Sequence, residues 1–90
     1  MKLLVKGHVN DRGNHAEFSS LIDDLSIGKK TPLAVQDVYL QIKEISPYVV
    51  NFLLVRFDTV DEFHLRHDEK YEFTHRGNAY EYRLEFSLED

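Results

Sequence analysis

The sequence predicts a β-rich α+β fold, in which five to seven antiparallel strands form a small barrel or sandwich with one short helix near residues 19–26. Three observations support this prediction. The run from Tyr80 to Glu89 alternates apolar and polar residues without exception, as expected for a strand with one buried face. Similar runs recur along the chain, separated by turn-forming residues. The connections between them are too short for parallel crossovers, so we expect antiparallel strands.

Length and composition indicate a single compact domain that covers residues 1–90. Cysteine is absent, which excludes disulfides, thiolate metal sites and cysteine nucleophiles. The N-terminus lacks the apolar core of a signal peptide. The longest nearly apolar run, residues 48–55, is far shorter than the ~20 residues that span a bilayer. We therefore expect a soluble, cytoplasmic protein with no membrane partner.

The first third of the chain predicts a strand, a turn and a helix. Residues 2–9 alternate as a strand, and residues 10–14 are turn formers. Apolar residues then recur at i, i+3, i+4 and i+7 from Phe18 to Leu25, as on one face of a helix. A second interpretation makes residues 15–18 the returning strand of a hairpin, followed by a shorter helix. Both interpretations place a helix over residues 21–25.

The middle of the chain is ambiguous in one segment and clear in the next. Residues 31–45 fit a helix that begins at Pro32, but alternation and a high β-branched content favour a strand, which we prefer. The run from Tyr48 to Phe57 predicts a central strand, because both of its alternating faces are apolar. Such a strand needs cover on both sides, so the sequence allows a homodimer through Tyr48 to Phe57.

Acidic residues are concentrated in the last third of the chain. The balance of charge is +1 over residues 1–57 and −6 over residues 58–90. Without a cluster of Lys and Arg, direct nucleic-acid binding is disfavoured. If residues 70–75 pair with the final strand around a turn at Gly77 and Asn78, the polar face of this hairpin becomes a mixed, mainly acidic grid. The candidate partner-binding residues are Glu72, Glu81, Arg83 and Glu85 on this face, with Asp68 and Glu69 in the preceding turn.

Catalytic signals are weak. His64, His67 and His75 are the candidate metal ligands, but residues three apart on a strand point to opposite faces, so the first two would chelate together only across a turn. No nucleophile elbow and no glycine-rich phosphate loop occurs. We therefore expect no enzyme, no cofactor and no metal. A histidine-based metal-dependent hydrolase remains the weakest of the functional alternatives.

These features favour a non-enzymatic protein-binding module. The specific hypothesis is a small acidic inhibitor, immunity or accessory protein that docks on a basic surface of a partner, such as a nuclease or another nucleic-acid-binding protein. The alternative is a self-associating structural or assembly subunit of a mobile element or phage. The polar face also fits an ordinary solvated sheet whose Glu and Arg side chains pair across strands.

Overall fold

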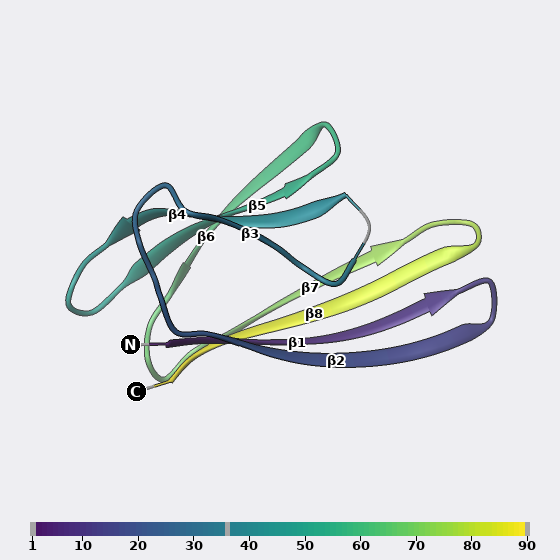
Figure 1. Cartoon of the computed structure of the whole chain (residues 1–90), viewed down its shortest axis with the longest axis horizontal. Coiled ribbons are helices and arrows are strands. Elements are labelled where there is room, and N and C mark those ends of the chain that lie inside the picture. Colours follow the sequence, from purple (N-terminus) through teal and green to yellow (C-terminus); the bar gives the residue numbers. More distant parts are fainter. Residues whose placement is uncertain (1, 36, 90) are drawn as a thin grey trace.

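The computed structural model describes residues 2–35 and 37–89, and the chain forms an all-β sandwich (Figure 1). The strands are β1 (Lys2–Asp11), β2 (Asn14–Ile22), β3 (Lys30–Pro32), β4 (Val38–Ile45), β5 (Val50–Arg56), β6 (Thr59–Leu65), β7 (Lys70–Arg76) and β8 (Tyr80–Glu89). The first sheet has the order β2-β1-β8-β7 and the second sheet the order β3-β4-β5-β6. β1 begins beside the end of β8, because Lys2 is paired with Glu89 (Figure 1).

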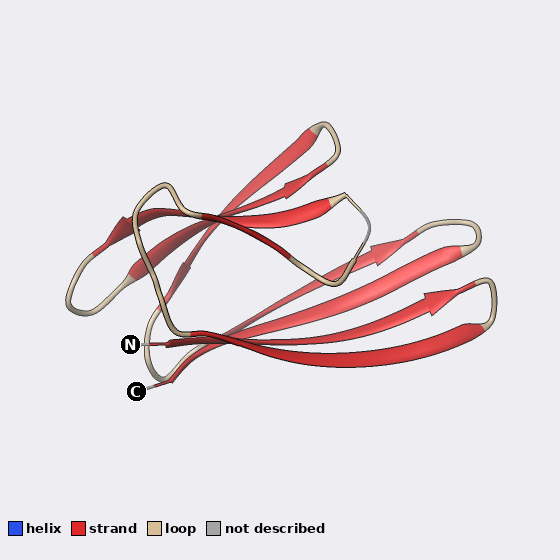
Figure 2. Ribbon diagram, in the orientation of Figure 1, coloured by secondary structure: helices blue, strands red, loops and turns tan. Residues whose placement is uncertain are grey.

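The predicted α+β class is wrong, because none of the described residues forms a helix (Figure 2). Residues 19–22, where the sequence predicts the helix, complete β2, which pairs with β1 over its whole length. The turn between these strands sets the pairing: Arg12 and Gly13 have φ values of 53° and 85°, as a type I′ hairpin requires. The hairpin interpretation of residues 15–18 is therefore confirmed.

The strand count also differs from the prediction, since the described residues form eight strands instead of five to seven. All strand pairs are antiparallel, as predicted. The strands form two separate sheets and are not closed into a barrel. No helix long and apolar enough to cross a membrane occurs in residues 2–35 and 37–89.

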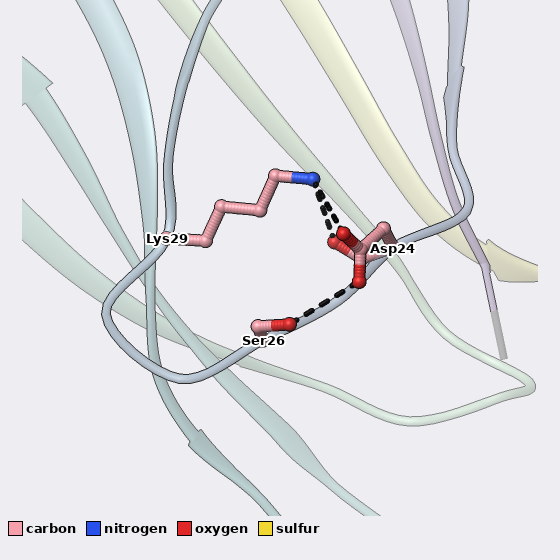
Figure 3. Close-up of polar contacts among 3 residues, drawn as sticks. All are labelled: Asp24, Ser26 and Lys29. Atoms are coloured by element: carbon pink, nitrogen blue, oxygen red, sulfur yellow. Dashed lines mark hydrogen bonds and ion pairs between the residues drawn. The ribbon is translucent and has the colours of Figure 1, made fainter.

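The end of the predicted helix is a loop that carries the chain from the first sheet to the second. Lys29 Nζ donates to the Asp24 carboxylate Oδ2 at 3.3 Å and to the Asp24 backbone carbonyl at 3.1 Å (Figure 3). The Ser26 hydroxyl donates to Asp24 Oδ1 at 3.2 Å. The hydrogen bond from Lys29, then the one from Ser26, hold the pKa of the Asp24 carboxyl below its ordinary value. These polar contacts stabilise the loop, and they take the place of the backbone hydrogen bonds that a helix would form here.

The remaining strands largely follow the sequence pattern. The strand interpretation of residues 31–45 is confirmed where β3 and β4 lie. β5 lies inside the second sheet between β4 and β6, as expected for a strand with two apolar faces. β8 has the predicted bounds, and its pairing with both β1 and β7 makes it a central strand of the first sheet. The pairing of β1 with β8 joins the two chain ends, which no local pattern reveals.

Inward-facing residues of both sheets form one core. The side chains of Phe52, Leu84 and Phe86 are completely buried. The ring of Phe63 on β6 stacks on that of Tyr71 on β7, with centroids 4.1 Å apart, and so joins the second sheet to the first. Phe63 also lies 5.1 Å from Phe86. Such aromatic pairs add to the stabilisation from buried area.

Candidate functional site

The polar face, which we define as the outward-facing side of the first sheet, holds most of the predicted partner-binding residues. The structure brings four of the six together there: Glu72, Glu81, Arg83 and Glu85. The other two, Asp68 and Glu69, lie in the turn between β6 and β7, where Glu69 Oε1 is 3.8 Å from Nε of Arg66. The predicted pairing of these two strands, with the four side chains on one face, is therefore confirmed, while the role of these residues in binding stays a prediction.

The charge of the polar face depends on β1, which the sequence does not place beside β8. Lys6 lies opposite Glu85, and His8 lies opposite Arg83. The outward charged residues are Glu17, Glu72, Glu81, Glu85 and Glu89, against Lys2, Lys6, Lys70, Arg76 and Arg83. Among the described residues of this face, acidic and basic side chains are thus equal in number, and the expected acidic excess is not found there.

Two hollows of about 450 and 350 Å³ lie on the polar face and share His8 and Arg83 as lining residues. His8 Nδ1 lies 3.1 Å from Oε1 of Glu17, and Lys70 Nζ lies 3.5 Å from Oε1 of Glu85. Charges of both signs therefore neutralise one another across these hollows. This pattern favours the solvated-sheet interpretation of the polar face.

The three histidines proposed as metal ligands do not lie together. His64 Nδ1, on the outer side of β6, is 2.5 Å from Asn51 Oδ1. His67 lies in the turn after β6, and the ring of His75 on β7 stacks on Tyr82 with centroids 5.1 Å apart. Residues 2–35 and 37–89 contain no group of three His, Asp or Glu side chains that could hold a metal ion.

The most unusual residue of the structure is Phe57 in the turn between β5 and β6. It is 87% exposed. Arg56 and Thr59 are paired across the hairpin, so Phe57 and Asp58 are the two central residues of the turn. Phe57 has a φ of 50°, and Asp58 does not share the positive sign. These signs are those of a type II′ turn, whose first central position favours glycine.

The conformation of Phe57 is held by a contact with the β3–β4 connection. The Phe57 N–H donates to the Asp37 carbonyl at 3.2 Å, and Asp37 itself has a φ of 60°. Asp37 and Asp58 are both exposed. Among the described residues, neither carboxylate lies within ion-pair distance of a cation. We call Asp37, Phe57 and Asp58, with the hollows beside them, the Phe57 end.

Phe57 is a lining residue of two hollows. One, of about 530 Å³, is lined largely by apolar side chains, among them Pro32, Leu33, Val35, Val38 and Tyr39. The other, of about 450 Å³, is more polar and is lined by residues that include Arg56, Thr59, His75, Tyr80 and Tyr82. Phe57 therefore lines both an apolar and a more polar recess.

Arg56 anchors the base of this turn. Its Nη2 lies 2.5 Å from Oδ2 of Asp61, and its guanidinium carbon lies 4.3 Å from the ring centroid of Phe73 in the first sheet. Its Nε is buried without a hydrogen-bond partner among the described residues. Nearby, burial raises the pKa of the Tyr82 hydroxyl, and the neighbouring Arg56 opposes this shift. Arg56 thus ties the Phe57 turn to the opposite sheet.

The outer side of β5 bears on the predicted homodimer. Leu53 and Val55 on this side are half-buried. Lys43 Nζ on β4 reaches across β5 to Oε1 of Glu62 on β6, 2.7 Å away. Their hydrogen bond lowers the pKa of the Glu62 carboxyl and raises that of the Lys43 ammonium. This ion pair covers part of the outer apolar face of β5. The homodimer through Tyr48 to Phe57 stays a prediction.

Comparison with known proteins adds no functional assignment. No protein-family model matches the chain, and no curated protein or solved structure is significantly similar to it. Function is therefore inferred from geometry and charge. The key residue, Phe57, was assigned by sequence to a strand face, because an apolar run continues to it without a break. The following Asp58 and Thr59 are turn-forming residues and were the available signal for a turn.

Proposed function

We propose that this protein is a non-enzymatic protein-binding module that docks on its partner through the Phe57 end. The observation that carries the proposal is an 87% exposed phenylalanine with a φ of 50° in a turn position that favours glycine. A bulky residue in such a conformation stores roughly 1–3 kcal/mol of backbone strain. Exposed loops that a rigid β scaffold positions are frequent binding sites.

The Phe57 ring gains little from the fold that holds it. An 87% exposed side chain contributes little apolar burial, so the strain has no compensation from core packing. The backbone hydrogen bond to Asp37 would form equally well with glycine at position 57. A compensating contact outside the monomer accounts for a phenylalanine at this position, and aromatic side chains are common anchors of protein interfaces.

The acidic residues next to Phe57 indicate the chemistry of the partner. Asp58 follows Phe57 in the turn, and Asp37 accepts the Phe57 N–H through its backbone carbonyl. The described residues provide no cation to pair with either carboxylate. An apolar pocket rimmed by Lys or Arg would complement this arrangement. Such charges act mainly on association rate and specificity. The acidic docking hypothesis therefore moves from the polar face to the Phe57 end.

This partner chemistry fits the class of small inhibitor, immunity or accessory proteins. A member of this class occupies a basic surface of its target, such as the nucleic-acid site of a nuclease. The net charge of −5 is consistent with attraction to such a surface.

The test is affinity capture from the source cells followed by calorimetry with the purified partner. Wild-type protein, Phe57→Gly and Arg12→Gly serve as baits, because both substitutions place glycine at a position of positive φ in a two-residue turn. We expect one basic protein to be retained by wild type and Arg12→Gly, and its affinity for Phe57→Gly to fall by about thirtyfold or more, as for an aromatic hot spot. Equal affinity for all three proteins would contradict the proposal.

A further inference from the structure

We infer that the open edge of β2 is a pairing site for a second copy of the chain. Two β2 strands pair antiparallel about a two-fold axis, so that the two first sheets become one continuous sheet. This inference concerns a surface other than the Phe57 end and does not depend on the proposed function. β2 is the outermost strand of its sheet (Figure 1), and β1 is its only strand partner within residues 2–35 and 37–89.

Comparison of the four sheet edges singles out β2. Natural edge strands are protected by Pro, by Lys or other charges, by bulges or by short length. β3 has three residues and contains Pro32, β6 contains Asp61 and Glu62, and β7 begins with Lys70 and ends with Arg76. β2 has nine residues, no Pro, Lys or Arg, and a ladder with β1 that shows no bulge. Its one acidic or basic side chain is Glu17, so β2 is the longest and least protected of the four edges.

The backbone of β2 presents a regular set of hydrogen-bonding groups to a partner. A two-residue hairpin makes the residues that flank its loop a hydrogen-bonded pair, and such pairs alternate along the ladder. Starting from Asn14, every second residue of β2 therefore bonds to β1. The N–H and C=O groups that point away from β1 belong to His15, Glu17, Ser19 and Leu21.

Side chains leave this edge accessible. The ring of Phe18 lies over Gly7 of β1, so closely that a Cβ at position 7 would come within 2.0 Å of it. This ring therefore leans toward the interior of the sheet. The single charged side chain of β2, Glu17, contacts His8 of β1. Phe18 and Glu17 thus both contact β1 instead of covering the outer edge of β2.

The sequence of β2 favours a second copy as the occupant. A two-fold axis at Phe18 pairs all nine residues of one β2 with all nine of the other. In this register Glu17 lies opposite Ser19 of the second copy, so no like charges face each other. A shift that centres the axis on Glu17 would place two carboxylates opposite each other. The register centred on Phe18 therefore has both the longest pairing and no opposed carboxylates.

Substitutions at position 19 test both the interface and its register. Ser19→Glu places two pairs of opposing glutamates in the dimer, and we expect the dimer dissociation constant to rise about fivefold. Ser19→Lys places two Glu–Lys pairs there, and we expect the constant to fall by a similar factor. Sedimentation equilibrium from micromolar to millimolar concentration measures both changes. If the dimer formed through any other surface, Ser19→Glu and Ser19→Lys would not change its dissociation constant in opposite directions.

The monomer responds in the opposite sense, which separates folding from association. Residue 19 lies opposite Lys6 within the chain, so Ser19→Glu gains a cross-strand ion pair and Ser19→Lys creates a repulsion. Thermal unfolding at low concentration reports these effects. Thr74→Glu and Thr74→Lys, on the exposed side of the other edge strand of the same sheet, are the matched controls and should leave the dissociation constant unchanged.

Hydrogen exchange gives an independent readout of the same register. On raising the concentration, the amides of His15, Glu17, Ser19 and Leu21 should gain protection, whereas those of Ala16, Phe18 and Ser20 are already protected by β1. A monomer at all concentrations would overturn the inference. So would a dimer that Val55→Lys dissociates and the Ser19 variants leave unchanged, because that dimer would use the outer side of β5.

Discussion

The β1–β2 and β5–β6 hairpins use similar turns with very different side chains. Each is closed by two residues, the first of which is not glycine and has a positive φ, 53° for Arg12 and 50° for Phe57. Both turns are also tethered by a backbone hydrogen bond to another connection of the chain. In the first turn a charged residue precedes Gly13, whereas in the second an aromatic ring is exposed.

Folding alone explains the side chains of the first turn but not that of Phe57. Arg12 and Gly13 provide a solvated side chain and a glycine where the backbone needs positive φ. Phe57 provides neither a favoured backbone conformation nor burial. The hairpins are also anchored differently, since Phe18 covers Gly7 in the first and Arg56 contacts Asp61 in the second.

The largest effect is expected from Gly7→Val, which breaks the anchor of the β1–β2 hairpin. A Cβ at position 7 would lie 2.0 Å from the ring of Phe18, so the ring must leave the core edge. We expect a loss of about 2 kcal/mol in the free energy of unfolding, measured by chemical denaturation. In a Phe18→Ala background the same substitution should cost much less, and a full cost there would contradict the steric explanation.

Arg56→Met tests the anchor of the β5–β6 hairpin. Methionine keeps the apolar contact with Phe73 but removes the ion pair with Asp61. Because Asp61 is partly exposed, we expect a loss of about 1 kcal/mol, below the cost of breaking a fully buried pair. A double-mutant cycle with Asp61→Asn isolates the pair. Additive losses in that cycle would show that the two side chains do not interact.

The contrast between the hairpins also shows what sequence could predict. β8 was predicted with its bounds because its alternation is local and uninterrupted. The helix over residues 21–25 was not formed, since Phe18 and Ile22 fit the inner side of a strand as well as one side of a helix. Tertiary pairing with β1 decided between them. The balanced charge of the polar face depends on the β1–β8 pair, which joins the two ends of the chain.

Turn chemistry limited the prediction of the site. A tight two-residue turn in the last hairpin would need a positive φ, which Gly77 or Asn78 could supply, but neither residue has one. Gly77 instead donates its N–H to the Tyr80 carbonyl at 3.0 Å. Among the described residues, the non-glycine residues with positive φ are Arg12, Asp37 and Phe57, and neither arginine nor phenylalanine is a residue type that favours this conformation. Site residues placed by a strained backbone are therefore the ones that residue patterns miss.

Glycine substitutions compare the two turns directly, and their expected effect on stability is smaller. Glycine at position 12 or 57 relieves backbone strain in the folded state but increases the entropy of the unfolded chain. We expect both Arg12→Gly and Phe57→Gly to stabilise the protein by about 0.5 kcal/mol, which is a rise of roughly 2–4 °C in Tm. Differential scanning calorimetry measures this rise. If Phe57→Gly lowered Tm, the ring would contribute to folding and its exposure would need no external partner.

The smallest effect concerns Lys43 and Glu62, which lie on the same sheet as Phe57. Contact with Lys43 lowers the pKa of Glu62 below its ordinary value of 4.5. A carboxyl with a lowered folded-state pKa contributes stability above its ordinary pKa and loses that contribution as the pH falls through the folded value. The stability difference between wild type and Glu62→Gln should therefore be constant at neutral pH and shrink below pH 4.5.

The alkaline side of the same pair provides the complementary measurement. The pKa of Lys43 is raised above 10.5, so its contribution is complete below that pH and declines as the pH rises through the folded value. The difference in unfolding free energy between wild type and Glu62→Gln should therefore be constant near neutral pH and decline at both acidic and alkaline pH. Because both side chains are exposed to solvent, added salt should flatten it. A difference that did not vary with pH would mean that the ion pair adds nothing to the cover over β5.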